Sequence, residues 1–296
     1  MRLLLSSRAQ FCDSVVKNFF GWLPDKPYLS LRYRFLMGHW IDWKNPKTFT
    51  EKLQWLKVYN RKSEYTMMVD KYAVKQYVAD RIGQQYIIPT LGVWDKTEDI
   101  DWDSLPEQFV LKTTHGGGSS GVVICKDKAN FDRGAAVAKL EESISSDLYS
   151  ALREWPYKNV PKRIIAEKFM APVKETVLTD LPDYKFFCFN GQPEFVELYI
   201  DRFGNHKKLF CDMDWNVAGF TTANDVAKVT VEQPKEFAEM KEVAKALCEG
   251  MAFVRVDLYV HGGKVYFGEM TFHPAGGYTP ITPREWEYKL GDMIKI

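Results

Sequence analysis

Residues 252–270 read AFVRVDLYV-HGG-KVYFGEM, two apolar runs separated by a His-Gly-Gly segment. Apolar and polar side chains alternate in both runs, which predicts two strands, and the glycines predict a hairpin turn. Side chains on a strand alternate between faces, so Asp257 and Glu269 share a face only if the loop has an odd number of residues. We therefore expect a three-residue loop centred on Gly263, with Asp257 directly opposite Glu269 and their Cβ atoms roughly 5 Å apart.

Two carboxylates that face each other across a hairpin repel, so we expect a cation between Asp257 and Glu269. Magnesium is the leading candidate, because it binds through one or two carboxylates and takes its other ligands from water and nucleotide phosphates. The pair therefore predicts a site for a magnesium-bound nucleotide.

The composition is that of a globular protein with a substantial core. The 296 residues are 46% hydrophobic and 15% aromatic, which allows one large domain or two to three smaller ones. Forty basic residues balance thirty-nine acidic ones, so the chain lacks the basic excess expected of a general nucleic-acid binder. Five scattered cysteines show no metal-ligand spacing and are typical of a reducing cytoplasm.

The N-terminal segment carries a short apolar run and then an aromatic one. Leu3-Leu4-Leu5 is too short for a transmembrane helix or a signal peptide. Residues 9–23 follow a roughly helical apolar pattern, so we expect a helix that packs on the body of the protein. The alternative is a helix that binds a membrane surface or a peripheral polysaccharide-assembly partner. We expect a cytoplasmic protein, located at the inner face of the membrane under that alternative.

The remaining pattern is mixed α+β and dominated by hairpins, unlike the βαβ alternation of a Rossmann domain. Thr48 followed by Glu51 fits a capping box, and Asp70 fits an N-cap for a helix that ends at Gly83. The expected helices span 27–38, 48–59, 70–82, 132–148, 234–249 and 283–295. Besides the hairpin, the expected strands span 86–88, 109–113, 122–125, 163–170, 184–189, 194–200 and 207–211.

A glycine-rich loop, His115-Gly116-Gly117-Gly118-Ser119-Ser120-Gly121, joins two of these strands. Glycines let backbone amides wrap around a phosphate chain, because no Cβ intervenes. A Walker loop runs from a strand into a helix and ends in Gly-Lys-Ser/Thr, whereas here Lys112 precedes the glycines and a strand follows them. The loop is therefore neither a Walker nor a Rossmann loop, and it indicates a flap that closes over a nucleotide. Lys71, expected in the first turn of the helix capped by Asp70, is a second candidate phosphate ligand.

The order of these motifs carries a resemblance to a known family. Seven charged residues and the flap occur in the order seen in ATP-grasp enzymes: Lys71, Lys112, Glu167, Lys168, Arg255, Asp257 and Glu269. The chain most resembles the TupA-like ATP-grasp family of bacterial surface-polysaccharide loci. The resemblance also rests on Asn45-Pro46-Lys47-Thr48-Phe49, Glu51-Lys52-Leu53-Gln54-Trp55-Leu56, Val69-Asp70-Lys71-Tyr72, Leu91-Gly92-Val93-Trp94, the run from Asp183 to Gly191, and Gly268-Glu269-Met270-Thr271-Phe272.

The resemblance implies the ATP-grasp fold, an α+β architecture in which two subdomains sandwich ATP. We expect a helical N-terminal region over 1–68, a small subdomain with the flap over 69–170, and a C-terminal subdomain with the metal site over 171–296. The implied cofactors are ATP and Mg²⁺.

The resemblance also assigns the nucleotide contacts by motif position. They would be Lys71, Lys112, His115, Gly116, Gly117, Gly118, Ser119, Ser120, Glu167, Lys168, Asp183 and Lys185. Among them, Glu167 and Lys168 would meet the adenine, and Asp183 or Lys185 would reach the ribose or a phosphate.

The metal ligands and the catalytic cations follow from the same resemblance. Asp257 and Glu269 resemble the magnesium ligands, and Thr271 stands where many ATP-grasp ligases have an asparagine as a further ligand. Arg255 and Lys112 would be catalytic, because phosphoryl transfer needs charge neutralisation more than a covalent nucleophile.

The implied reaction makes an acyl phosphate from a carboxylate and ATP, and an amine then attacks to give an amide, ADP and phosphate. Its substrates would be a small-molecule or sugar-linked carboxylate and an amine, such as a uronic acid and an amino acid in capsule or O-antigen synthesis. The candidate substrate contacts are Arg202, His206 and His273. The alternative is a glycosyltransferase, whose Asp-x-Asp motif would be Asp101-Trp102-Asp103 or Asp212-Met213-Asp214.

Overall fold

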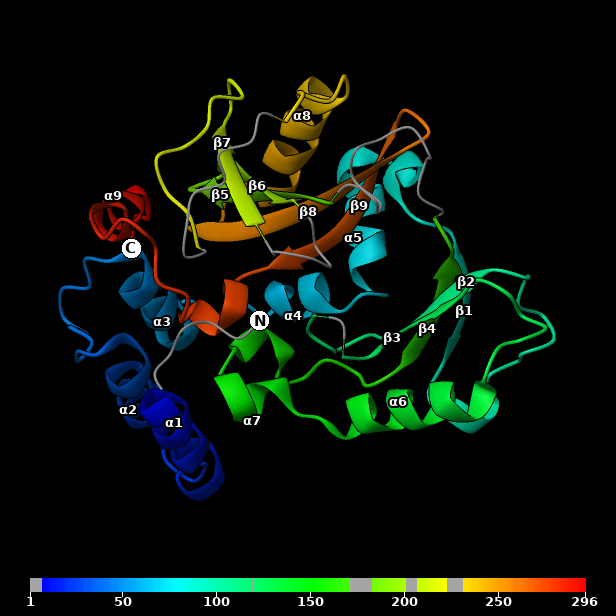
Figure 1. Ribbon diagram of the computed structural model, residues 1–296, viewed down its shortest axis with the longest axis horizontal. Coiled ribbons are helices and arrows are strands. Elements are labelled where there is room, and N and C mark those ends of the chain that lie inside the picture. The colour runs from blue at the N-terminus through cyan, green and yellow to red at the C-terminus, as the bar shows by residue number, and fades with distance from the viewer. Residues whose placement is uncertain (1–6, 119, 171–182, 201–206, 223–230) are drawn as a thin grey trace.

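The computed structural model describes residues 7–118, 120–170, 183–200, 207–222 and 231–296. Within them the chain builds two antiparallel sheets, one of four strands in the order β1-β4-β2-β3 and one of five in the order β7-β6-β5-β8-β9. Figure 1 shows the two sheets in separate halves of the molecule, with helices α4 and α5 between them. The expected α+β class is confirmed.

The N-terminal part of the chain is helical, and the four-stranded sheet follows it. The helices are α1 (Ser7–Phe19), α2 (Asp25–Met37), α3 (Phe49–Tyr59), α4 (Glu64–Val69) and α5 (Val74–Ile82). The next elements are β1 (Thr90–Trp94), β2 (Phe109–Thr113), β3 (Val122–Cys125), α6 (Arg133–Ser145), α7 (Leu148–Leu152) and β4 (Ile164–Lys168), with 3₁₀ turns at Gln84–Tyr86, Thr97–Asp99 and Trp155–Tyr157.

The C-terminal part forms the five-stranded sheet. Its elements are β5 (Asp183–Phe189), β6 (Gln192–Ile200), β7 (Lys207–Asp212), α8 (Phe237–Cys248), β8 (Phe253–His261), β9 (Lys264–Thr271), a 3₁₀ turn η4 (Pro274–Gly277) and α9 (Glu285–Met293).

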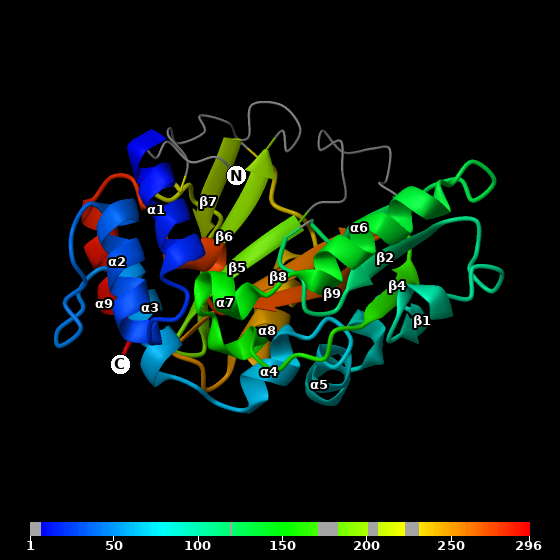
Figure 2. The same cartoon turned by 90° about the horizontal axis from the view of Figure 1, so that it is seen from below.

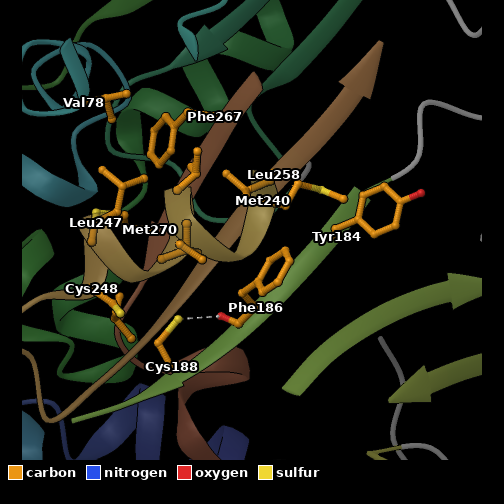
Figure 3. Packing of buried hydrophobic residues seen from close by; sticks show 14 of the residues in the cluster. Val78, Tyr184, Phe186, Cys188, Met240, Leu247, Cys248, Leu258, Phe267 and Met270 are labelled. Carbon is orange, nitrogen blue, oxygen red and sulfur yellow. Dashed lines mark hydrogen bonds between the residues drawn. The ribbon is translucent and has the colours of Figure 1, made fainter. Parts of the chain in front are cut away.

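Helix α8 covers one face of the five-stranded sheet. Its buried residues Met240, Val243, Ala244 and Leu247 recur at helical spacing and meet the apolar side chains of alternate strand positions. Figure 3 shows this packing around Phe186, with the labelled side chains of α8 and the strands in contact. Each large side chain buried here contributes about 1.5–3 kcal/mol of hydrophobic stabilisation. Helices α4 and α5 join the same cluster, although the division expected at residue 69 groups α5 with the other sheet.

The opposite face of the five-stranded sheet is divided between apolar and charged residues. Towards one end, Phe187, Phe189 and Phe253 are covered by α3 and α9, with the ring of Phe49 5.1 Å from that of Phe253. Towards the other end, the same alternation places Lys185 two residues before Phe187, on the same face. The helical N-terminal region therefore covers half of this face and leaves the charged half for a site.

The four-stranded sheet is also covered on one face. Helix α6 packs Leu140 against Phe109, Leu111 and Ile164, and Figure 2 shows the helix running along the sheet. Alternation sends Lys112 to the face away from α6. Each sheet thus has charged side chains on the face opposite its covering helix, α8 for one sheet and α6 for the other.

The hairpin of β8 and β9 confirms one expectation and corrects another. Asp257 pairs directly with Glu269, as predicted. The loop has two residues and not three, because His261 pairs with Lys264 and both intervening glycines have positive φ. The odd residue is Gly268, which forms a β-bulge between the pairs Asp257–Glu269 and Leu258–Phe267.

Two other local expectations are wrong, and two helix expectations are confirmed. Residues 84–86 form a 3₁₀ turn, and the strand expected at 86–88 begins at Thr90. The helix expected over 132–148 forms as α6 and ends at Ser145, and Asp147 then caps the separate helix α7. Helix α5 begins at Val74, because Asp70 accepts hydrogen bonds in a turn before it, from the amides of residues 72 and 73. The capping box at Thr48 forms as predicted, with Thr48 and Glu51 bonding reciprocally.

Candidate nucleotide and metal site

The charged half of the five-stranded sheet is centred on the buried carboxylate of Asp257. Lys185, its register partner on β5, donates to Oδ2 at 2.5 Å. Arg255, two residues earlier on β8, donates to both oxygens at 2.6 and 2.7 Å. Lys185 also pairs with Asp183 at 2.5 Å. Neighbouring strands thus bring four predicted site residues into one ionic cluster.

The pKa values in this cluster follow from burial and pairing. Burial alone would raise the pKa of the Asp257 carboxyl, but Arg255 and Lys185 outweigh it and hold the pKa below its ordinary value. Burial would likewise lower the pKa of Lys185, but Asp257 and Asp183 raise it. Burial, with Asp257 nearby, raises the pKa of Asp183 despite Lys185. The cations of the cluster are therefore firmly charged at neutral pH.

Glu269 is the accessible end of the cluster. Its side chain is 32% exposed, whereas that of Asp257 is 1% exposed. Glu269 Oε1 accepts from Arg255 Nη2 at 3.1 Å, and Thr271 Oγ1 lies 3.2 Å from the same nitrogen and 3.5 Å from Oε1. The three predicted metal ligands therefore lie together, linked through Arg255.

The donor set fits magnesium that is shared with phosphates. Among the described residues, no group of three or more His, Cys, Asp or Glu side chains could hold a metal ion. Asp257 and Glu269 would supply two carboxylates, which leaves the remaining ligands to phosphate or water oxygens, as Mg²⁺ prefers. Glu269 would be the more available ligand, because both oxygens of Asp257 already accept hydrogen bonds.

The face of the four-stranded sheet that points away from α6 holds a second ionic cluster, around the buried side chain of Glu167. Lys112 and Lys75 each approach its carboxylate at 2.6 Å, one on each oxygen. Burial would raise the pKa of Glu167, but the two lysines outweigh it and lower the pKa. Glu167, predicted to meet an adenine, is thus engaged by lysines, while Lys168 next to it is exposed. Sequence reasoning missed Lys75, although it lies four residues after Lys71.

Lys71 connects the two clusters electrostatically. Its amide donates to Thr114 O at 3.0 Å and its ammonium donates to Gly116 O, so the lysine lies at the base of the glycine loop and not in a helix. Burial lowers the pKa of Lys71; Glu269 on one sheet opposes that shift, and Lys112 on the other adds to it. Charged side chains of both sheets therefore act on the ammonium group of Lys71.

The glycine loop connects β2 and β3, as predicted, and is anchored at its base. His115 is buried, and its Nε2 lies 3.1 Å from Ser143 O on α6. A Cβ at Gly121 would lie closer than 3.0 Å to Ser143 Oγ, so only glycine fits this approach. Gly116 is also buried. Gly117, Gly118 and Ser120 lie towards the tip, and Ser119 lies outside the described residues.

The predicted substrate contacts are only partly placed. Arg202 and His206 lie outside the described residues. His273 follows β9 and is buried, with Nδ1 3.7 Å from Glu154 Oε2, and burial lowers its pKa despite that carboxylate. His273 is therefore neutral at pH 7 and packed within the protein.

The loop that His273 begins is held by two buried side chains of α3. Gln54 Nε2 donates to the carbonyls of Gly276 and Gly277 at 3.1 and 2.8 Å. Lys57 Nζ donates to Gly276 O at 2.7 Å and to Leu152 O at 2.9 Å. Sequence reasoning assigned no role to either residue. What marks them is seen in the structure: an amide and an amine that are fully buried beside the apolar positions of α3, where polar groups need hydrogen-bond partners.

The two Asp-x-Asp motifs serve turns. Asp212 Oδ1 accepts from the amides of Asp214 and Asn216 at 3.0 and 2.8 Å, and Asp101 Oδ1 accepts from Ser104 N at 3.2 Å. The first carboxylate of each motif is thus used to order the following loop. Among the described helices, none is long and apolar enough to cross a membrane.

Several solved structures are similar to this chain. D-alanine–D-alanine ligase from Helicobacter pylori is 14% identical, covering 84% of this chain and 70% of that one, with a TM-score of 0.49. The enzyme of the same name from Bacillus anthracis, complexed with ATP, is 17% identical, covering 77% and 63%, with a TM-score of 0.42. An ADP complex of N5-carboxyaminoimidazole ribonucleotide synthetase is 14% identical, covering 75% and 50%, with a TM-score of 0.42.

This chain therefore spans between half and about two thirds of the length of these proteins. Among curated proteins, none has a sequence that matches it significantly. The family described as TupA-like ATPgrasp matches residues 51–295, which include both ionic clusters and the glycine loop. The chain belongs to this TupA-like ATP-grasp family.

Proposed function

We propose that the protein is an ATP- and Mg²⁺-dependent ligase that joins a carboxylate to an amine. The observation that carries the proposal is the pairing of Asp257 with Glu269 on the five-stranded sheet, together with Lys71 bound at the base of the glycine loop of the four-stranded sheet. Carboxylates that can hold magnesium on the five-stranded sheet, and lysines at the four-stranded sheet and the glycine loop, suit a magnesium-bound triphosphate lying between them. Membership of an ATP-grasp family supports the same nucleotide.

ATP would lie with its phosphates between the two clusters. Lys71 and Lys112 would contact the phosphates, and Lys112 would leave Glu167 to do so, since its ammonium bonds that carboxylate in the structure. Asp257 and Glu269 would hold magnesium, with Thr271 beside Glu269. When bound, magnesium supplies neutralisation of the phosphate charge.

The reaction would proceed in two balanced steps. In the first, an oxygen of the substrate carboxylate bonds to the γ-phosphorus of ATP, and the bond to the bridging oxygen breaks to release ADP. In the second, the amine nitrogen bonds to the acyl carbon, phosphate leaves, and the amine loses a proton. Arg255 would stabilise the transferred charge, because it is held in place by Asp257 and Glu269 on a rigid strand.

We place the substrates beside Glu269, next to the loop of His273. We infer that they are a uronic acid and an amino acid or other amine, in capsule or O-antigen synthesis. This class of substrate is the one that the resemblance to surface-polysaccharide enzymes implies, and Arg202 and His206 would add cationic or hydrogen-bonding contacts to it. No described contact favours a glycosyltransferase, because both Asp-x-Asp motifs order turns.

The test is to incubate the protein with Mg-ATP and pairs of uronic acids and amines, and to measure ADP, phosphate and amide. ADP release that depends on both substrates would support the proposal, whereas UDP release from a nucleotide sugar would overturn it. Glu269→Gln should abolish turnover with little loss of stability, since Glu269 is partly exposed. Glu98→Gln, at an exposed position, is the matched control and should retain full activity.

A further inference from the structure

The first forty residues lie outside the region that the family shares, which begins at Glu51. Figures 1 and 2 show α1 and α2 side by side at one end of the molecule, away from the four-stranded sheet. The pair is firmly attached to the body: buried Arg32 donates to Asp13 at 2.6 Å and to Ala151 O, at the end of α7, at 2.6 Å. This helical pair is therefore an ordered addition whose outer surface is available.

That outer surface is aromatic. Fourteen large hydrophobic side chains are exposed among the described residues, and six of them, all aromatic, lie between residues 11 and 40: Phe11, Phe19, Phe20, Trp22, Phe35 and Trp40. Phe11, Val15 and Phe19 are spaced by four residues and share one side of α1. Phe19 and Trp22 are 71% and 76% exposed. Scattered apolar residues are common on a surface, but such a cluster indicates an interaction site.

The same segment is basic. The first forty residues contain six Arg and Lys residues but only two acidic ones, a net charge of +4. The whole chain has a formal charge of +1, so the remaining residues carry −3. The two acids, Asp13 and Asp25, are both paired with cations, to Lys17 at 2.7 Å and to Arg61 at 2.5 Å. Among the described residues of the segment, Arg8, Lys26 and Arg34 are exposed, whereas Arg32 is buried, so the surface presents aromatic rings together with cations.

We propose that the α1–α2 surface docks on the surface of an anionic phospholipid bilayer. Aromatic side chains insert at the boundary of headgroups and acyl chains, and basic residues are attracted to anionic headgroups. Trp22 is suited to that boundary, because an indole ring combines an apolar body with a polar N–H. A second copy of this chain is a poorer occupant, since two surfaces that each expose Arg8, Lys26 and Arg34 would repel.

Vesicle flotation of the full chain tests this proposal. The protein should float with vesicles of phosphatidylglycerol and phosphatidylcholine, and bind about tenfold more weakly to phosphatidylcholine alone. Raising the salt concentration from 0.05 to 0.5 M should weaken the binding, because salt screens the charges. The double variant Phe19→Ser/Trp22→Ser should lose about tenfold in affinity while keeping its thermal midpoint, because both rings already face solvent.

Val217→Ser, at an exposed apolar position of another region, is the matched control and should bind as the parent does. Equal binding to neutral and anionic vesicles would overturn the proposal, as would unchanged binding of the double variant. Failure to bind either vesicle, together with dimers that the double variant abolishes, would show that a second copy covers this surface. Ligase activity measured without vesicles should be unaffected by the double variant, so this test is independent of the proposed reaction.

Discussion

Lys57 offers the sharpest test of how the helical N-terminal region supports the site. Its ammonium is fully buried and donates to two backbone carbonyls, Leu152 O and Gly276 O. Burial lowers the pKa of Lys57 to about 7, although Glu154 opposes the shift. We therefore predict that Lys57 makes stability depend on pH between about 7 and 10, and that Lys57→Met removes this part of the dependence.

The magnitude follows from proton linkage. Between pH 7 and 10.5 the unfolded chain keeps the Lys57 proton and the folded chain has lost it, so the free energy of unfolding rises with pH. Each full pH unit adds about 1.4 kcal/mol to the free energy of unfolding while the folded chain lacks the proton. Between pH 7 and pH 9 the gain is about 2 kcal/mol and not twice 1.4, because Lys57 is still half-protonated in the folded chain at pH 7. This contribution is fully present above the unfolded pKa and is lost as pH falls to about 7.

Methionine also removes the donor from two buried carbonyls, and Gly276 O keeps its bond to Gln54. Leaving Leu152 O unpaired should cost about 1–3 kcal/mol. Relative to the parent, Lys57→Met is therefore expected to be about 2 kcal/mol less stable at pH 9 than at pH 7, because only the parent gains stability between these pH values.

Urea denaturation of the parent and Lys57→Met at pH 7, 8 and 9 measures this difference. Lys245→Met, at an exposed position of α8, controls for the loss of a helical lysine. The reasoning is refuted if the difference in free energy of unfolding between parent and Lys57→Met stays the same at all three pH values. A change below about 0.5 kcal/mol counts as no change, because this is roughly the accuracy of such differences.

Three further predictions concern the ionic clusters and the flap. Lys185→Met should destabilise the fold by about 3–5 kcal/mol at pH 7, because it removes a cation from the buried carboxylates of Asp257 and Asp183. Urea denaturation should show a smaller loss at pH 5, because without Lys185 the pKa of both carboxyls rises and protonation removes the unpaired charge more readily. Lys75→Met should weaken binding of a non-hydrolysable ATP analogue about tenfold, as measured by calorimetry. Lys112 would then be the only lysine paired with Glu167, so it would be held there more strongly and be less free to contact the phosphates. Gly121→Ala should lower the thermal midpoint and the ATPase rate, because its Cβ would overlap a neighbouring hydroxyl oxygen, at a cost of about 1–3 kcal/mol.

Each of these has a clear contrary outcome. A loss for Lys185→Met that is equal at the two pH values would show that the lysine acts by packing and not by charge. Unchanged affinity in Lys75→Met would mean that its pairing with Glu167 does not affect ATP binding. A fully stable Gly121→Ala would contradict the close approach of the flap to α6.

Sequence reasoning succeeded where a local pattern determines the structure. Alternation predicted that β8 and β9 pair with Asp257 directly opposite Glu269, and this pair is observed. The Thr48–Glu51 capping box was readable because its partners lie three residues apart. The ATP-grasp fold, expected from the order of the motifs, is confirmed by the family to which the chain belongs.

Other features depended on contacts between distant parts of the chain. The predicted loop length was wrong because the extra residue lies in the strand and not in the turn. The bulge at Gly268, packed closely against Tyr259, brings Asp257 and Glu269 to the same face, as a three-residue loop would have done. The roles of Lys75 and Lys57 were missed because their partners, Glu167 and Gly276, lie more than ninety residues and more than two hundred residues away. No local periodicity reports such partners.

The sequence alone therefore determined most of the helices and strands, the pairing of the two acids and the glycine loop between two strands, since side-chain alternation, caps and glycine conformations act over a few residues. Only the tertiary structure decided that Asp257 is neutralised by Lys185 and Arg255, that Glu167 holds two lysines, and that α3 covers half of the site's face. The physical reason is that ionic pairing depends on distances of a few ångströms between side chains, and these are set by strand register and by the packing of helices on sheets.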